Sequence, residues 1–154
     1  MITKEEMLLS FRYNPESGDL FYANGGNAKT ISNGYRVVKY NGKQCKVHRI
    51  AWMIFYGYLP SGHIDHINGN RLDNRISNLR ACSCSENLMN VKIGKKNTSG
   101  VKGVTLHKRS NKWQAQLMAA GKSLYLGIFN TICEAENAVK AARELHHGKF
   151  ANHG

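Results

Sequence analysis

The chain has 154 residues, a length that favours one ordinary domain or two small ones. Its 22 Lys and Arg residues against 10 Asp and Glu residues give a net charge of +12, and an apolar content of 42% argues against a disordered basic tail. The absence of a long apolar run excludes a membrane span, and the lack of a secretory signal together with only four scattered cysteines favours an intracellular, cytoplasmic protein.

The first half of the chain reads as a helix, paired strands and a second helix. A capping box at Thr3 and Glu6 predicts a short N-terminal helix. The Asn41-Gly42 pair predicts a hairpin turn, and the apolar run 50–55 predicts a buried helix that ends at Gly57. The extended segments predicted here are 11–13, 20–22, 34–40 and 43–47.

Residues 62–78 differ in composition, because they are dense in Asn, Asp, His and Gly. Such a stretch predicts a loop whose side chains bond to its own backbone. A short strand is expected at 79–82, and Ser85 can cap a following helix. The small polar residues 93–100 are the candidate linker between a first domain, 1–92, and a second domain, 101–154.

The second domain reads as three strands followed by a helix. The strands are expected at 101–106, 113–119 and 123–129. Alternation places Trp113, Ala115 and Leu117 on one face of the middle strand, and a second capping box at Thr131 and Glu134 opens the helix. The helix positions expected to form one stripe against the sheet are Ala135, Ala138, Ala142 and Leu145.

The positive charge is unevenly distributed along the chain. The net charge is +1 over residues 1–40, +4 over 41–92 and +7 over 93–154, and no acidic residue lies between Glu86 and Glu134. A solvated surface that keeps the protein soluble is the alternative explanation. Aromatic residues within the basic segment, Trp113 and Tyr125, favour nucleic acid as the partner.

The candidate catalytic set is Asp65, His66, Asn78 and Asn87. On an extended segment, adjacent Asp65 and His66 side chains point to opposite faces, so the carboxylate can hold a metal while the imidazole acts as general base. An amide oxygen can orient the second ring nitrogen of the base. Taken one residue at a time, each of these has an ordinary structural explanation, and the combination is what indicates phosphodiester hydrolysis.

At these residues the sequence resembles the HNH endonucleases, specifically the homing type of phages and introns, over roughly residues 1–92. The matching runs are Val47-His48-Arg49, Asp65-His66-Ile67-Asn68-Gly69-Asn70, Asn74-Arg75, Asn78-Leu79-Arg80 and Glu86-Asn87. The resemblance implies a ββα-metal (His-Me finger) fold with Asp65 and Asn87 as metal ligands, His66 as base and Asn78 as its orienting partner. Arg75 and Arg80 are the implied phosphate contacts.

The implied cofactor is one divalent cation. A site of one carboxylate and one amide favours Mg²⁺ or Mn²⁺ over zinc, and the final motif position is Asn87 where many family members carry His. Cys82-Ser83-Cys84 lacks a second pair at zinc-ligand spacing, so we expect all four cysteines to be buried thiols. His48 is expected to be structural or to contact phosphate, and His63 to lie in a loop near the substrate.

Residues 99–152 have a second resemblance, to the plant ethylene-response-factor (APETALA) DNA-binding domain. It is carried by Ser99–Val104, Lys112–Leu117, Tyr125–Phe129, Thr131–Ala142 and Leu145–Asn152. The resemblance implies that a three-stranded antiparallel sheet on one helix enters the major groove. Thr105, Met118 and Ser123 stand where several plant domains carry Arg, so the target sequence does not transfer. The candidate DNA contacts are Lys102, Thr105, Arg109, Lys112, Gln114, Gln116, Lys122 and Tyr125.

Together these features predict an α+β protein with an HNH nuclease domain and a small sheet-and-helix domain that binds double-stranded DNA. The expected function is a metal-dependent, site-selective DNA endonuclease of the homing type, encoded by a phage or mobile element and acting in the host cytoplasm. One alternative is a DNA-binding regulator whose HNH module is a relic. Another is a non-specific, toxin-like nuclease. Oligomeric state, and hence nicking or double-strand cleavage, stays open.

Overall fold

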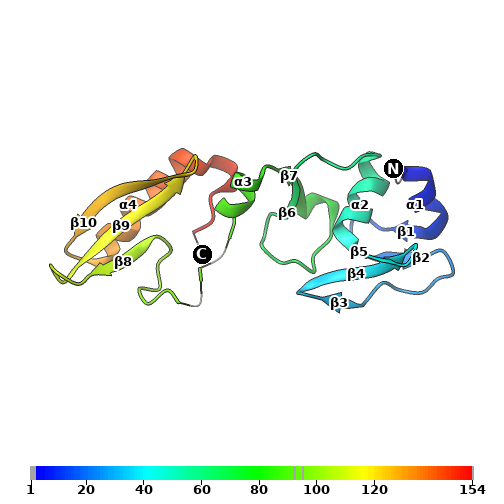
Figure 1. The fold of residues 1–154 in the computed structure, drawn as a ribbon, viewed down its shortest axis with the longest axis horizontal. Coiled ribbons are helices and arrows are strands. Elements are labelled where there is room, and N and C mark those ends of the chain that lie inside the picture. The colour runs from blue at the N-terminus through cyan, green and yellow to red at the C-terminus, as the bar shows by residue number, and fades with distance from the viewer. Residues whose placement is uncertain (1–2, 92, 95, 154) are drawn as a thin grey trace. The chain divides into compact units, whose positions relative to one another are not determined.

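The structure, a computed structural model, describes residues 3–91, 93–94 and 96–153, and its contacts divide the chain into two compact units (Figure 1). Unit 1 is Met1–Cys82 and unit 2 is Ser83–Gly154. The division falls after Cys82, and the domain boundaries 1–92 and 101–154 with a linker at 93–100 stay a sequence prediction. Lys92 and Lys95 of the basic segment lie outside the described residues.

The two units are both mixtures of helices and antiparallel strands, as the α+β prediction requires. Unit 1 contains α1 (Lys4–Ser10), β1 (Phe11–Tyr13), β2 (Leu20–Tyr22), β3 (Ile31–Ser32), β4 (Tyr35–Tyr40), β5 (Lys43–Lys46), α2 (Val47–Tyr56), β6 (His63–His66), the 3-10 helix η1 (Ile76–Asn78) and β7 (Leu79–Cys82). Unit 2 contains α3 (Cys84–Met89), β8 (Val104–His107), β9 (Lys112–Ala119), β10 (Lys122–Phe129), α4 (Ile132–His147) and the 3-10 helix η2 (Gly148–Phe150).

Local signals in the sequence set the first elements of unit 1. The Thr3 hydroxyl accepts a hydrogen bond from the Glu6 amide at 3.2 Å and the Glu6 carboxylate accepts one from the Thr3 amide at 2.9 Å, which confirms the capping box of α1. Asn41 and Gly42 both have positive φ, 47° and 74°, as a two-residue turn between right-twisted strands requires. That turn joins β4 to β5 in register.

Helix α2 is the centre of unit 1. Seven of its ten residues are buried, so it is apolar almost all round and contacts neighbours on more than one side. One cluster joins it to α1, β1, β2 and β4, and includes Phe11, Leu20 and Ile50. A second cluster packs Ala51 and Trp52 against Ile64 of β6 and Leu79 of β7. The helix therefore fixes the β6–β7 ribbon on the rest of the unit.

The structure corrects two local predictions in the middle of the chain. Residues 63–66 form strand β6, paired with β7, which confirms the extended segment expected at Asp65 and His66 and shows that the loop predicted over 62–78 begins only after His66. Helix α3 is capped by Ser83 and not by Ser85, because the Ser83 hydroxyl accepts from the Glu86 amide and the Glu86 carboxylate bonds back to Ser83. A serine three residues before a glutamate completes a capping box, whereas Ser85 stands one residue before that glutamate.

Unit 2 is a three-stranded antiparallel sheet, in the order β10-β9-β8, packed on α4 (Figure 1). The core is formed by Val104, Ala115, Ala135 and Val139, with Trp113 and Leu126 against it. Ala115 and Leu117 are buried while Gln116 and Met118 are exposed, so the predicted inner face of the middle strand is confirmed. The opposite face of the sheet, on which Gln116, Met118 and Tyr125 are exposed, is left uncovered by the described residues of unit 2.

The stripe predicted on α4 is right at Ala135, which is buried, and wrong at Leu145, while Ala138 and Ala142 are half-buried. Its buried residues are Ala135, Val139, Arg143 and His147, whereas Leu145 is 79% exposed. Arg143 is buried because it donates a 2.8 Å hydrogen bond to the carbonyl of Lys102, and the ring Nε2 of His147 lies 2.8 Å from the carbonyl of Met118. The buried side of α4 therefore contains two polar side chains that bond to backbone carbonyls, whereas the hydrophobic pattern predicted Ala138, Ala142 and Leu145 there.

The prediction of four buried thiols is also wrong. Cys82 is buried, Cys45 is half-buried, and Cys84 and Cys133 are exposed, all as free cysteines. Cys84 and Cys133 stand in the first turns of α3 and α4, where the chain faces solvent. Among the described residues, every helix is too short or too polar to cross a membrane.

Candidate functional site

The β6–β7 ribbon places Asp65 beside Arg80. The two residues are cross-strand partners, and both Nε and an Nη of Arg80 contact Oδ2 of Asp65, at 2.9 and 2.8 Å. Both side chains are largely buried, so this ion pair is shielded from water. The carboxylate predicted to hold a metal therefore has a guanidinium on one of its oxygens.

The loop that joins β6 to β7 is built from its own asparagine and aspartate side chains. Asn68 Oδ1 accepts from the Asn70 amide at 2.8 Å, Asn70 Oδ1 accepts from the Leu72 amide at 3.1 Å, and Asp73 Oδ1 accepts from the Arg75 amide at 3.3 Å. Each is an i to i+2 bond, the pattern in which these residues replace a backbone turn. The loop is therefore an ordered turn, as its composition predicts.

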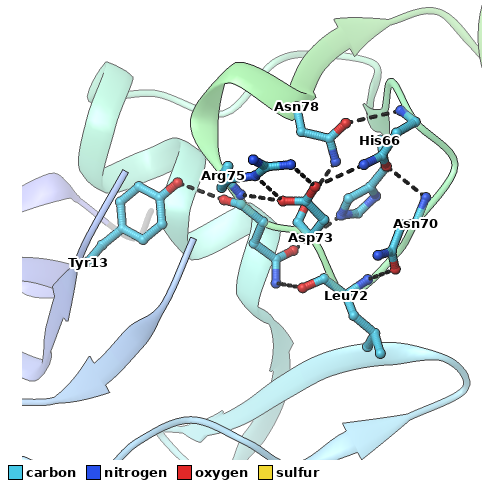
Figure 2. Close-up of polar contacts among 9 residues, drawn as sticks. Tyr13, His66, Asn70, Leu72, Asp73, Arg75 and Asn78 are labelled. Carbon is cyan, nitrogen blue, oxygen red and sulfur yellow. Dashed lines mark hydrogen bonds and ion pairs between the residues drawn. The ribbon is translucent and has the colours of Figure 1, made fainter. Parts of the chain in front are cut away.

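Asn78 closes the base of this loop (Figure 2). Its Oδ1 accepts from the Asn68 amide at 3.0 Å and its Nδ2 donates to the Asp73 carbonyl at 2.8 Å. The residue is buried in η1, immediately before β7, and not on the paired strand itself. Both ends of its amide thus hold the loop backbone, which positions the residues between 68 and 73.

The His66 ring meets Asn74 of the same loop. Ring Nε2 lies 3.1 Å from Asn74 Oδ1, and Asn74, which is 1% exposed, donates its Nδ2 to the Leu72 carbonyl at 3.3 Å. That second bond fixes which end of the amide is oxygen. Since an amide oxygen only accepts, Nε2 carries the ring proton and the lone pair lies on Nδ1.

Burial controls the charge of the histidines at this point. Burial lowers the pKa of His66, partly opposed by the hydrogen bond to Asn74. It also lowers the pKa of His48, to about 3. Both rings are neutral near pH 7, and a neutral imidazole can accept a proton.

The His66 ring has aromatic neighbours, and two basic side chains lie next to one of them. The His48 ring stands edge-on to the His66 ring with centroids 5.0 Å apart, and Tyr35 lies 5.4 Å from His48 and 6.1 Å from His66. The ammonium of Lys46 lies 4.2 Å, and the guanidinium of Arg71 4.9 Å, from the centre of the Tyr35 ring. Two cations thus contact the Tyr35 ring beside the histidine pair.

A second segment supports the loop from behind. The Tyr13 hydroxyl donates to the Asn74 carbonyl at 2.7 Å (Figure 2), and the Ile76 amide donates to the Pro15 carbonyl at 3.1 Å. Gly18, with φ of 75°, approaches so closely that a Cβ there would lie 2.4 Å from the Arg75 nitrogen. The turn between β1 and β2 therefore fixes the place of Asn74.

The two arginines predicted to contact phosphate are paired with carboxylates. Arg80 pairs with Asp65, and Arg75 binds both oxygens of Asp73, at 2.8 and 2.6 Å. That hydrogen bonding by Arg75 lowers the pKa of Asp73 to about 2. Asn87, the second predicted metal ligand, lies on α3 in unit 2, so the geometry of unit 1 does not include it.

The sequence of this chain is similar to those of known proteins. A family described as HNH endonuclease matches residues 45–89, which contain β6, the loop, β7 and α3. Protein 3.8 of Escherichia phage T7 is 36% identical over 105 residues, covering 68% of this chain and 86% of that protein. The chain belongs to the HNH endonuclease family.

A solved structure of an HNH endonuclease is also similar. It describes DNA binding and cleavage by the HNH homing endonuclease I-HmuI, and is 19% identical with a TM-score of 0.44 over 90% of this chain and 85% of that one. The family match thus assigns an HNH endonuclease domain to residues 45–89, and a phage protein is among the relatives of the chain.

Most of the predicted DNA contacts of this HNH protein lie on the exposed surface of unit 2. Thr105, Gln116, Lys122 and Tyr125 are exposed on the strands, together with Lys112 and, half-buried, Gln114; Arg109 is exposed in the β8–β9 turn. Lys102 differs, because its ammonium donates to the carbonyls of Met89, Val91 and Asn152. Its charge is directed into unit 2, and burial lowers its pKa to about 8.

Sequence reasoning missed several residues around His66. Asn74 stands inside the quoted motif, yet only the fold shows that its side chain reaches the ring. The contacts of Tyr35 with Lys46 and Arg71 join three separate parts of the chain, so no local sequence pattern predicts them. The sequence does give one signal for Asn74. It directly follows Asp73, whose side chain forms one of the hydrogen-bonded turns of this loop.

Proposed function

We propose that this protein is a metal-dependent DNA endonuclease in which His66 is the general base. The observation that carries the proposal is the setting of that ring: a buried, neutral imidazole whose Nε2 proton is directed to Asn74 and whose neighbours are aromatic. A base with a fixed tautomer and a pKa at or below neutrality can take a proton from water that attacks phosphorus.

We propose that Asn74 and Asn78 both orient His66, in different ways. Asn74 bonds the ring directly, and Asn78 acts through the loop backbone as a positioning residue. This differs from the role implied for Asn78 by family resemblance, in which its own amide meets the ring. Either amide keeps the imidazole from rotating, which a general base requires.

The donor at Asp65 fits a hard divalent cation, because it is a carboxylate beside the proposed base, and Asn87 is the second ligand that the sequence predicts. A donor set of one carboxylate and one amide oxygen fits Mg²⁺ or Mn²⁺, which can be held by few protein oxygens, better than zinc. When bound, such a cation supplies charge stabilisation for the departing oxygen.

Lys46 and Arg71 are the cations best placed to hold the scissile phosphate. Both are exposed, and both lie on the Tyr35 ring that borders His66. Arg75 and Arg80, by contrast, are paired with carboxylates. We therefore assign phosphate positioning first to Lys46 and Arg71, and to the other two only where DNA displaces their partners.

Unit 2 is proposed to hold double-stranded DNA through the uncovered face of its sheet, in the manner of an ethylene-response-factor domain. The support is the positive charge of a segment with no acidic residue between Glu86 and Glu134, together with the exposure of Lys112 on that face, Arg109 in the β8–β9 turn and Lys122 at the start of β10. A separate DNA-holding unit favours a site-selective, homing-type nuclease of a phage or mobile element over a non-specific one.

The test is cleavage of supercoiled plasmid with Mg²⁺, Mn²⁺ or EDTA, followed by mapping of the ends. His66→Ala is expected to lower the cleavage rate by at least about a hundredfold while leaving DNA affinity nearly unchanged. His146→Ala is the matched control, because His146 is an exposed histidine on α4 in unit 2 and belongs to no predicted site. EDTA should abolish cutting by the unmodified protein.

Three other results of the cleavage test would each contradict a different part of the proposal. Retained cutting by His66→Ala would exclude His66 as the base. Tight DNA binding without cleavage in any metal would favour the regulator with a relic HNH module. Ends mapped to many unrelated sites would indicate a non-specific nuclease.

A further inference from the structure

The uncovered face of the β8–β9–β10 sheet has a defined set of side chains at its centre. Strand pairing places Thr105 beside Gln114 and Gln114 beside Ile128, then Gln116 beside Tyr125 and Met118 beside Ser123. Cross-strand partners share a face, so these side chains form adjacent rows on the outer surface. Gln116, Met118 and Tyr125 are exposed, the last two by 58% and 59%.

A β-bulge determines one of these neighbours. The register shifts between Tyr125 and Gly127, so that Gly127 pairs with Ala115 and Ile128 pairs with Gln114. Without the extra residue, glycine would stand opposite Gln114 and Ile128 would face the core. The bulge therefore brings an apolar side chain to the outer face beside a glutamine.

The centre of this face lacks the side chains that usually read G·C pairs. Guanine is most often read by arginine or lysine, and cytosine by aspartate or glutamate. Arginine, aspartate and glutamate do not occur in β8, β9 or β10, and the lysines of these strands, Lys112 and Lys122, stand at their first positions, away from the centre. At the strand ends a lysine is placed to contact phosphate.

The same composition matches A·T pairs. A glutamine side chain bonds both N6 and N7 of adenine, and the thymine methyl is met by apolar groups. Gln114 and Gln116 supply the amides that can bond adenine. Thr105, Ile128 and Met118 supply apolar groups for the thymine methyl. Gln114 Nε2 lies 3.5 Å from Gln116 Oε1, so the two amides are side by side. Two residues apart along a strand is about 6.8 Å, or about two base-pair steps.

We infer that the outer face of the β8–β9–β10 sheet reads A·T base pairs in the major groove through Gln114 and Gln116, with thymine methyl groups against Thr105, Met118 and Ile128. The inference rests on the proposed function of unit 2 as the DNA-holding part, and it adds the base pairs that this part selects. The occupant is duplex DNA because an acid-free, basic segment surrounds the face.

The test uses the full chain with His66→Ala, in EDTA, and fluorescence anisotropy on labelled duplexes of equal length. The duplexes contain A·T, G·C or inosine·cytosine pairs. Inosine·cytosine keeps the major-groove edge of G·C and the minor-groove edge of A·T, so it separates the two grooves. We expect the A·T duplex to bind about tenfold more tightly than the other two, which should bind alike. A duplex with uracil in place of thymine lacks the methyl and should bind with intermediate affinity.

Variants locate the preference on the sheet. The double change Gln114→Ala with Gln116→Ala should reduce the ratio of A·T to G·C affinity to near one, and Gln116→Arg should raise affinity for G·C. Gln44→Ala is the matched control, because Gln44 is an exposed glutamine on β5 in unit 1. It should leave the ratio unchanged.

The outcomes separate this inference from the proposal beneath it. Equal affinity for A·T, G·C and inosine·cytosine duplexes would overturn the base preference while leaving DNA binding intact. Tight binding of inosine·cytosine would overturn major-groove readout, and equal binding of thymine and uracil duplexes would overturn the methyl contacts. A preference that survives the double glutamine change would overturn the residue assignment. No binding to any duplex would overturn the proposed role of unit 2 as well.

Discussion

Substitutions at Gly18 and Gly42 form a matched pair that measures how tightly the loop between β6 and β7 is packed against the β1–β2 turn. Both glycines have left-handed φ, 75° and 74°, so alanine at either one carries the same backbone cost of about 1 kcal/mol. A Cβ at Gly42 meets nothing within 4 Å, whereas a Cβ at Gly18 would lie 2.4 Å from the Arg75 nitrogen and 2.6 Å from the Asn74 carbonyl carbon. Only Gly18→Ala therefore forces two segments apart.

The expected magnitudes follow from that difference. Ordinary contact begins near 3.4 Å, so Gly18→Ala requires a movement of about 1 Å between backbones, and overpacking of this kind costs about 1–3 kcal/mol. We expect Gly42→Ala to lower the unfolding free energy of unit 1 by about 1 kcal/mol and Gly18→Ala by about 2–4 kcal/mol. Because Asn74 is one of the displaced residues, Gly18→Ala should also slow plasmid cleavage.

The assay is urea unfolding followed by tryptophan fluorescence. Of the two tryptophans of the chain, Trp52 lies in unit 1 and Trp113 in unit 2, so a Trp113→Phe background reports unit 1 alone. With an m value of about 1 kcal/mol/M, the midpoints should differ by at least about 1 M between the two variants. Equal midpoints, or equal cleavage rates of the folded variants, would refute the steric argument.

Two further predictions use the buried polar groups. Because burial lowers the pKa of His48 to about 3 while an unfolded histidine titrates near 6.5, the unfolded chain takes up the proton first, so stability of unit 1 should fall as pH decreases from about 6.5 toward 3. His48→Gln should weaken this dependence in urea unfolding at about pH 7 and about pH 5, and an unchanged dependence would assign it to other groups, His66 among them. Lys102→Met should destabilise unit 2 by about 1–3 kcal/mol, because three carbonyls lose their donor, without changing the salt dependence of DNA binding. Lys112→Met should instead reduce the salt slope by about one with little effect on stability, and the reverse pattern would contradict both assignments.

Local chemistry made much of this fold predictable. Capping boxes at Thr3 and Thr131 and the Asn41-Gly42 turn are decided by a few neighbouring residues, and the structure confirms each of them. Alternation along β9 likewise separated Ala115 and Leu117 from the exposed side chains. Such features need no information from distant parts of the chain.

Contacts between distant segments account for the errors. A 3.6-residue period allows either of two neighbouring stripes on α4, and the choice was made by backbone carbonyls of Lys102 and Met118 that receive Arg143 and His147. Strand β6 exists because β7 pairs with it across a nine-residue loop and η1, although its own composition reads as loop. In the same way, Asp65 and His66 were recognisable as a chemical pair, whereas Asn74 became visible only once the β1–β2 turn was packed against it.

The three carbonyls around the Lys102 ammonium have a consequence for how such proteins can be recombined. They tie α3 and the end of the chain to the start of β8, and Asn152 adds two 2.9 Å bonds from its Nδ2 to Asn90. A transplantable cassette therefore begins at Ser83, not at the polar stretch before Val101, and must extend through Asn152. Grafting that cassette onto another nuclease would carry Asn87 with it, so the proposed DNA-holding unit and the predicted second metal ligand would be transferred together.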